Sequence, residues 1–310
     1  MSSLPGEGQP TAAAEVQPYG EVFDLGYRHY EGRREGRAHA IRALVLYSVK
    51  RGLGIKKRWT AKIIPFGLYV VSFLPVIVII GVKALLGPIA DQVRFSYFNL
   101  YEMLTLIILL FAAGVAPEMI CDDRREHVLQ VYFARAISRL DYLLAKIGAM
   151  GFLIGTIAFL PALLLFLGYT FLASSPVEYF GDHFTDLGAI MLAGTLVALF
   201  YGAIATVVAV YIDRKGIASA TTVGGTLIMS AIASALFATV EGEWHRYFVL
   251  ADPLAVPQGF TKWIFSATRS DRIEPIVLEA GLPDWWYLLA VAAVVAICGL
   301  AMYRRYLMED

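Results

Sequence analysis

The sequence has few of the residues and motifs from which metal sites and catalytic sites are built. It contains only two cysteines, Cys121 and Cys298, whose positions fit neither a disulfide framework nor a zinc site. It has no G-x-x-x-x-G-K followed by Ser or Thr, the loop with which an ATPase binds phosphate. No Ser/His/Asp set, paired catalytic carboxylates or H-E-x-x-H motif stands out either. We therefore expect no enzymatic activity, no cofactor and no metal ion on this chain.

Charge is also scarce over most of the chain, and long apolar runs take its place. Hydrophobic residues make up 58% of the 310 residues, and the mean hydropathy is +0.63; soluble domains are about 45–50% apolar. A helix that crosses a bilayer needs about 20 apolar residues. Six runs are long enough: 63–86, 100–120, 143–173, 187–212, 217–240 and 285–303. The sequence therefore predicts an all-α polytopic membrane protein with a six-span transmembrane domain over residues 63–310. A soluble enzyme with six buried helices is the less favoured alternative.

The distribution of Lys and Arg predicts the orientation of the spans. Basic residues gather before the first span, between spans two and three, between spans four and five, and after span six. The loops on the other side hold few basic residues. The loop 241–284 is the exception, with four basic residues and a larger number of acidic ones. Excess Lys and Arg mark the cytoplasmic side. Both termini are therefore predicted to be cytoplasmic in a cell (inner or plasma) membrane, with 241–284 as an outer loop.

The N-terminal part divides into two segments. Residues 1–37 begin with many Pro, Gly, Ala and Glu residues and are expected to be flexible and cytoplasmic. Residues 38–62 carry apolar residues at helical spacing among basic ones, and the last of these precede a tryptophan. The residues at this end are Lys56, Lys57, Arg58 and Trp59. A basic amphipathic helix tends to lie in the membrane interface and bind anionic lipid, so lipid is a better partner than nucleic acid. A solvated run of charge is the alternative.

Residues 122–146 form a charged stretch between the second and third spans. Nine of these 25 residues are charged. The apolar ones recur every three or four positions, as on one face of a helix. They are Leu129, Phe133, Ile137, Leu140 and Leu144. Arg135 and Arg139 share another face, where two like charges slightly destabilise an isolated helix. We predict one amphipathic helix facing the cytoplasm. A plain loop that only sets the topology is an equal alternative on these grounds.

Four short motifs follow one another in this stretch. They are Asp123-Arg124-Arg125-Glu126, His127-Val128-Leu129, Ala136-Ile137-Ser138-Arg139 and Lys146. Their order resembles the cytoplasmic loop of ABC-2 type permeases, which shows an acidic residue and Arg, a Gly-Thr-Leu-like triplet, Pro-x-Ser-Arg and a later Lys. Here His-Val replaces Gly-Thr, and Ala136 replaces the proline. Six spans and a basic N-terminal helix extend the resemblance over most of residues 38–310.

The resemblance implies transport driven by ATP. Such a permease works with a second permease copy, identical or related, and with ABC ATPase subunits that hold the ATP and Mg²⁺. The loop between spans two and three would be a coupling helix in a groove of the ATPase. The resemblance assigns that contact to Asp123, Arg124, Arg125, Glu126, Arg135 and Arg139. Spans four and five hold almost no charge, so we expect export of an apolar or amphipathic solute.

Other residues are weaker candidates. Glu102 and Glu118 lie in the second span, where an ionisable group is costly and often functional, so both are candidates for the translocation path. The alternative is that they have no functional role and are tolerated because they lie near the span ends, where water reaches them. Residues 252–265 of the outer loop combine two prolines with aromatic residues and predict a helix at, or dipping into, the outer interface. Two other functions stay open: a membrane enzyme or assembly factor acting on lipid, and an ion-coupled secondary transporter.

Overall fold

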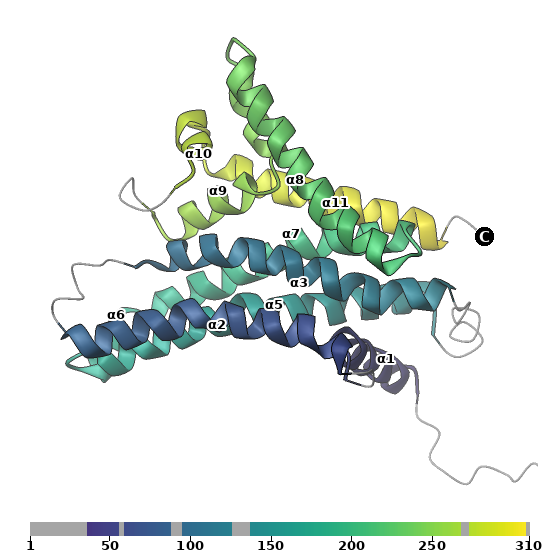
Figure 1. Cartoon of the computed structure of the whole chain (residues 1–310), viewed down its shortest axis with the longest axis horizontal. Coiled ribbons are helices and arrows are strands. Elements are labelled where there is room, and N and C mark those ends of the chain that lie inside the picture. The colour runs from purple at the N-terminus through teal and green to yellow at the C-terminus, as the bar shows by residue number, and fades with distance from the viewer. Residues whose placement is uncertain (1–35, 56–58, 88–94, 126–136, 268–272, 308–310) are drawn as a thin grey trace, which may run out of the picture. The chain divides into compact units, whose positions relative to one another are not determined.

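The chain folds into helices whose ends fall close to the predicted spans (Figure 1). A computed structural model describes residues 36–55, 59–87, 95–125, 137–267 and 273–307, and shows no strand among them. Six helices are long and apolar enough to cross a membrane: α2 (Thr60–Leu86), α3 (Tyr97–Arg125), α5 (Arg139–Leu172), α7 (Phe184–Tyr211), α8 (Lys215–Thr239) and α11 (Trp285–Leu307). The prediction of an all-α polytopic membrane protein is confirmed.

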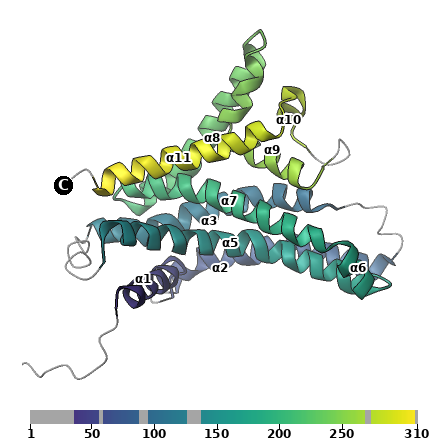
Figure 2. The same cartoon turned by 180° about the vertical axis from the view of Figure 1, so that it is seen from behind.

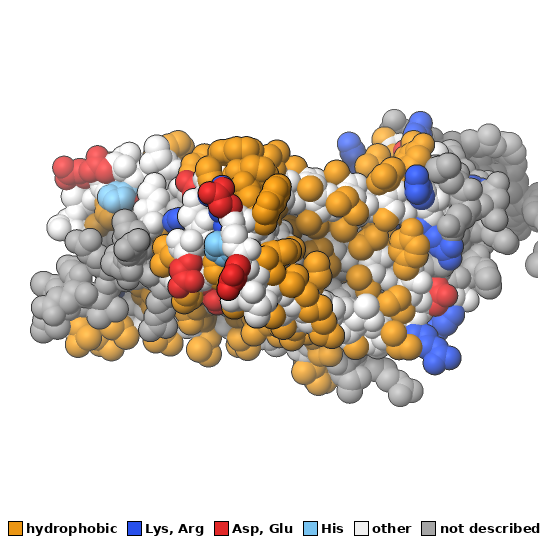
Figure 3. Space-filling model, turned by 90° about the horizontal axis from the view of Figure 1, so that it is seen from above, with side chains coloured by type: hydrophobic (Ala, Val, Ile, Leu, Met, Phe, Trp, Pro, Cys, Tyr) orange, Lys and Arg blue, Asp and Glu red, His pale blue; other side chains and the backbone are white. Residues whose placement is uncertain are grey.

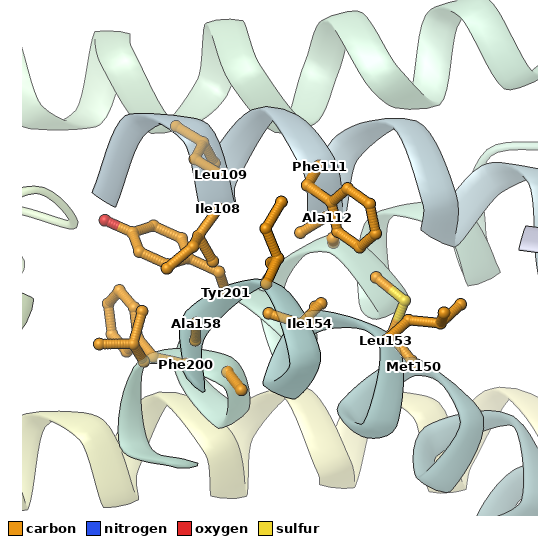
Figure 4. Packing of buried hydrophobic residues seen from close by; sticks show 14 of the residues in the cluster. Ile108, Leu109, Phe111, Ala112, Met150, Leu153, Ile154, Ala158, Phe200 and Tyr201 are labelled. Carbon is orange, nitrogen blue, oxygen red and sulfur yellow. The ribbon is translucent and has the colours of Figure 1, made fainter. Parts of the chain in front are cut away.

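The helices α3, α5 and α7 enclose the core of the bundle (Figure 4). Ile108 of α3, Ile154 and Ala158 of α5 and Tyr201 of α7 are completely buried there. Most residues of α2, α8 and α11 are not buried, although α11 runs along α7 over much of its length (Figure 2). The outer faces of these three helices are apolar, so they suit lipid or another chain.

The predicted interfacial helix over 38–62 is shorter in the structure and packs against protein. It is α1 (Arg37–Gly52), which ends because Gly54 adopts a positive φ of 67° and its N–H bonds back to the carbonyl of Arg51. The apolar face predicted for this helix is correct, but Leu44 is buried against α3 and α5. A Cβ on Gly52 would lie 2.8 Å from Leu153, so α1 and α5 are in close contact. The apolar side of α1 is therefore covered by the bundle, and its position in the membrane interface stays a prediction.

The single helix predicted over 122–146 is not continuous. Its first residues belong to the end of α3, and its last ones to the start of α5. Between them, Ser138 has an extended backbone and caps α5 with Asp141, each side chain accepting a hydrogen bond from the other's N–H. This Ser-x-x-Asp capping box starts a new helix, so Ile137 and Leu140 do not lie on one helix. Residues 126–136, where a coupling helix was predicted, lie outside the described residues.

The outer loop forms three short helices between α8 and α11: η2 (His245–Ala251), α9 (Ala255–Ile264) and α10 (Pro275–Ala280). Another short helix, α6 (Pro176–Asp182), joins α5 to α7. The helix predicted over 252–265 corresponds to α9, which packs against α3, α7 and α11, and its place at the outer interface stays a prediction. Asp252 begins it by accepting hydrogen bonds from the N–H groups of Leu254 and Ala255, at 2.8 and 3.3 Å. A Cβ on Gly259 would come within 2.1 Å of the Tyr287 ring, so α9 fits closely only because this residue has no side chain.

Candidate functional site: a charged cluster where four helices meet

Charged side chains from four helices meet at the end of the bundle where α3 stops and α5 starts. We call them the charged cluster. It consists of Arg51 of α1, Glu118, Asp122 and Asp123 of α3, Lys146 of α5 and Lys215 of α8. Three of these residues are basic and three are acidic, so their formal charges cancel. Their positions surround both ends of the predicted coupling stretch.

Asp123 occupies the buried part of the cluster. Its Oδ2 lies 2.7 Å from Lys146 Nζ and accepts a 2.8 Å hydrogen bond from the hydroxyl of Tyr142, while its Oδ1 pairs with Arg51. Lys146 also donates to the carbonyl oxygen of Met119 at 2.8 Å. The side chains of Asp123 and Lys146 are 1% and 2% exposed. These contacts join α1, α3 and α5 through charges that water does not reach.

Asp122 extends the cluster toward α8. Its Oδ2 lies 2.9 Å from Arg51 and also pairs with Lys215, the first residue of α8. Lys215 in turn lies 3.0 Å from Glu118, and these two side chains are 28% and 32% exposed. Partly exposed pairs contribute less than enclosed ones because solvent screens them. The connection to α8 is therefore weaker than the one among α1, α3 and α5.

The burial of these charges depends on their pairing. A buried charge is costly unless an opposite charge and hydrogen bonds compensate it, and removing one partner of a buried pair costs about 3–5 kcal/mol. Burial lowers the pKa of Arg51, but its hydrogen bonds and ion pairs with Asp122 and Asp123 raise it by more. The net pKa lies above the ordinary value, so the guanidinium stays protonated at every physiological pH.

A second contact joins the starts of α1 and α5. The guanidinium of Arg37 donates two hydrogen bonds to Asp141, from Nε at 2.8 Å and from a terminal nitrogen at 2.7 Å. The hydrogen bond to this carboxylate raises the pKa of Arg37. Because 63% of the Arg37 side chain is exposed, the pair contributes little energy but orients the end of α5 toward α1.

The predicted coupling residues differ in their accessibility. The carboxylate of Asp123 is enclosed by Arg51 and Lys146, so any effect it has on a docked chain passes through these neighbours. Arg125 has 64% of its side chain exposed and lies 3.6 Å from Asp122. Arg139, at the first turn of α5, is half-buried. The remaining three lie where the structure describes no side chain: Arg124, Glu126 and Arg135. Their contacts with an ATPase stay predictions.

The two candidate acids of the second span have different surroundings. Glu118 belongs to the charged cluster through Lys215. Glu102, nearer the other end of α3, accepts a 3.4 Å hydrogen bond from the amide of Gln258 in α9. Both lie beside another helix, and their part in a translocation path stays a prediction. Of the predicted interface residues, Trp59 is 78% exposed; Lys56, Lys57 and Arg58 lie outside the described residues.

Sequence reasoning missed most of the basic residues of the cluster. Arg51 and Lys215 lie 72 and 97 residues or so away from their acidic partners in the chain, and no local pattern connects them. Lys146 was noticed only as part of a motif. The start of α5, by contrast, could have been predicted from the sequence. Ser138 and Asp141 have the spacing of a capping box before an apolar run, which marks a helix start.

Charge is distributed unevenly on the face seen in Figure 3. Lys and Arg side chains gather toward one end and Asp, Glu and His toward the other, with hydrophobic side chains between them. Among the residues that the structure describes, no group of three His, Cys, Asp or Glu residues is placed to hold a metal ion.

The comparison with known families decides what this bundle belongs to. The model of a family described as ABC-2 family transporter protein matches residues 90–301. The chain belongs to this family. A search of the curated proteins finds no match to it. As a member of the ABC-2 family it is a multi-pass membrane permease of an ABC transporter, and the family implies an ABC ATPase as its partner. The ABC-2 match includes every acidic residue of the charged cluster, as well as Lys146 and Lys215, whereas Arg51 precedes it.

Proposed function

We propose that the chain is the permease subunit of an ATP-driven exporter and that the stretch 122–146 receives the movement of a separate ATPase. The observation that carries this proposal is the charged cluster. It ties both described ends of the stretch, the end of α3 and the start of α5, to α1 and α8. A displacement of this stretch therefore acts on four helices together.

The strength of the contacts suggests how the movement is shared. The enclosed pairs of Asp123 with Arg51 and Lys146 hold α1, α3 and α5 as one unit, because separating them leaves buried charges without partners. Lys215 pairs with both Glu118 and Asp122, but its side chain is 28% exposed, so water reaches these two pairs and they are cheaper to break. When the ATPase displaces the stretch 122–146, α8 is the helix of the four that moves relative to the other three. Rocking between inward- and outward-facing states would then occur between α8 and the α1–α3–α5 unit.

The remaining parts of the proposal follow from charge and polarity. The basic end of the molecule faces the cytoplasm, together with both termini, because Lys and Arg are retained on that side of a cell membrane. ATP and Mg²⁺ bind the ATPase. The solute is apolar or amphipathic, since α7 and α8 carry few charges. A second permease copy, identical or related, packs against the apolar outer faces of α2, α8 or α11.

The test is to purify the chain with an ABC ATPase and to reconstitute the complex in lipid. Replacing Arg125 and Arg139 by Ala should weaken association with the ATPase and lower transport per ATP hydrolysed, because both side chains lie at the ends of the predicted docking stretch. Arg214 is an exposed arginine at the start of α8 outside this stretch, so Arg214→Ala is the matched control. If association and coupled transport are the same in all variants, the proposal is contradicted.

A further inference from the structure

An apolar notch opens between α5, α7 and α11, in the half of the bundle nearer to the charged cluster. Its volume is about 120 Å³. Of its eleven lining residues only Thr206 carries a polar side chain. Three glycines, one from each helix, contribute to the wall: Gly151, Gly202 and Gly299. The notch opens to the surface of the bundle, where Leu199 is 43% exposed.

The small side chains explain why the notch stays open. A Cβ on Gly151 or Gly299 would meet no other atom within 4 Å, so neither helix presses on the other at these points. An apolar cavity of roughly 150 Å³ binds benzene, so a notch of this size accepts several carbon atoms of a hydrocarbon chain. Since α5, α7 and α11 are candidate spans, the notch lies at a depth where lipid chains surround the protein.

Basic residues lie at one end of the notch, on the same helices. Along α11, the lining residues Val295, Gly299 and Met302 follow steps of four and three, and the next step reaches Arg305, about 4.5 Å further along the axis. The guanidinium of Arg305 lies 5.8 Å from the centre of the Tyr211 ring, at the end of α7. The Tyr211 hydroxyl donates a 3.1 Å hydrogen bond to the carbonyl of Ala301, which holds this end of α7 against α11.

On α5, too, an arginine lies along the helix from the residues that line the notch. Arg139 is followed at steps of four by Leu143, Ile147 and Gly151, the last two of which line the notch. Arg139 thus lies about 12 Å along the axis from Ile147, on the same side of the helix. Arg304 is exposed, but it is two residues from Met302 and therefore lies on the other side of α11 from the notch. An arginine has five donors in a planar fork that matches phosphate oxygens, and it binds phosphate while keeping other contacts.

We propose that this notch is a binding site for an anionic phospholipid. One acyl chain fills the apolar notch, and the phosphate group lies at the end marked by Arg305 of α11 and Arg139 of α5. The charge of the site favours this occupant over a second copy of the chain. A parallel second copy would bring the same arginines to this end, and like charges repel. Since the lipid would contact α5 and α11 at once, its presence would set the spacing of these helices.

The test uses the full chain in nanodiscs that contain an anionic and a zwitterionic phospholipid with identical acyl chains, and native mass spectrometry counts the lipids retained. The wild type should retain the anionic lipid preferentially. Gly151→Leu and Gly299→Leu place a side chain in the notch and should weaken retention about tenfold or more, since two or three methylene groups lose their place. Arg305→Gln should weaken it about fivefold and lower the preference for the anionic lipid by the same factor.

Two control variants separate the site from general effects on the fold. Gly148→Leu adds the same side chain to α5 at an exposed glycine that does not line the notch. Arg214→Gln removes an exposed cation at the same end of the molecule but on α8. Both should retain lipid as the wild type does. Equal retention of the two lipids by the wild type, or equal losses in the controls, would overturn the proposal. So would a result in which Gly299→Leu disrupts a dimer while leaving lipid retention unchanged.

Discussion

The enclosed ion pair between Lys146 and Asp123 provides the sharpest test of the charged cluster. Lys146→Met removes a cation that is 2% exposed and 2.7 Å from the Asp123 carboxylate. Asp123 then keeps Arg51 and the Tyr142 hydroxyl, so the cost should lie near the lower end of the about 3–5 kcal/mol expected for breaking a buried pair. Asp123→Asn should cost more, because Lys146 is left with the Met119 carbonyl and Arg51 loses one of its two carboxylates.

Thermal unfolding of the purified protein in detergent measures these differences. A loss of about 3–5 kcal/mol should lower Tm on the order of 10 °C. Lys215→Met is the matched control, since the same change at a side chain that is 28% exposed should cost only about 1 kcal/mol or less. The double variant Asp123→Asn/Lys146→Met should be more stable than the sum of the single changes predicts, because both charges leave together. Equal Tm losses at Lys146 and Lys215, or strict additivity, would refute the reasoning.

Three further predictions concern single contacts. Ser138→Ala removes the cap of α5 and should cost about 1 kcal/mol, visible as faster amide exchange in the first turn of α5, whereas unchanged exchange would show that this end is held otherwise. Gly259→Ala should lower stability by about 1–3 kcal/mol, because its Cβ would collide with the ring of Tyr287; a Tm equal to that of the wild type would mean that α9 shifts freely. Glu118→Gln should change Tm little, since its pair with Lys215 is 32% and 28% exposed, but it should alter transport by loosening α8; a large loss of stability with normal transport would contradict this assignment.

The cluster combines two kinds of contact that serve different purposes in a moving protein. Fully enclosed pairs, such as Asp123 with Lys146, resist separation because each charge would remain in a medium of low dielectric constant. A half-hydrated pair such as Lys215 with Glu118 opens at little cost because water replaces the partner. A permease in which an ATPase moves one group of helices against another needs both. The enclosed pairs keep the moved group together, and the hydrated pair lets its neighbour separate.

Local patterns in the sequence were enough to predict the spans but not the neighbours of the charged residues. The apolar face of α1 was identified correctly from the positions of Ile41, Leu44 and Val45, since helical spacing is a local property. The pattern does not predict what this face contacts, because an apolar stripe packs equally well against lipid or protein. The same limit applies to α9, whose pattern predicts a helix but does not predict that it packs against α3 and α7.

The stretch 122–146 shows where local reasoning stops. Its apolar periodicity predicted one helix, yet Ser138 and Asp141 end that pattern with a capping box, a short-range signal that outweighs the longer repeat. The resemblance assigned Asp123 to a docking surface, yet this residue faces inward, where it is compensated by Arg51 and Lys146. The sequence around a carboxylate near a span end does not predict whether it contacts water, a partner protein or a buried cation.

The sequence by itself determined the six spans, the helical class and the excess of basic residues at one end, because hydrophobic length and charge near a span act locally and need no partner. Only the tertiary structure decided which charges are enclosed, that α1 packs on α5, and that glycines on three helices leave an open notch between them. These features depend on pairs of residues many positions apart, such as Arg51 with Asp123, whose contact exists only once the helices have packed. The charged stretch between the second and third spans is thus held from inside the bundle, by its own Lys146 and by Arg51 and Lys215, which lie outside it in the sequence.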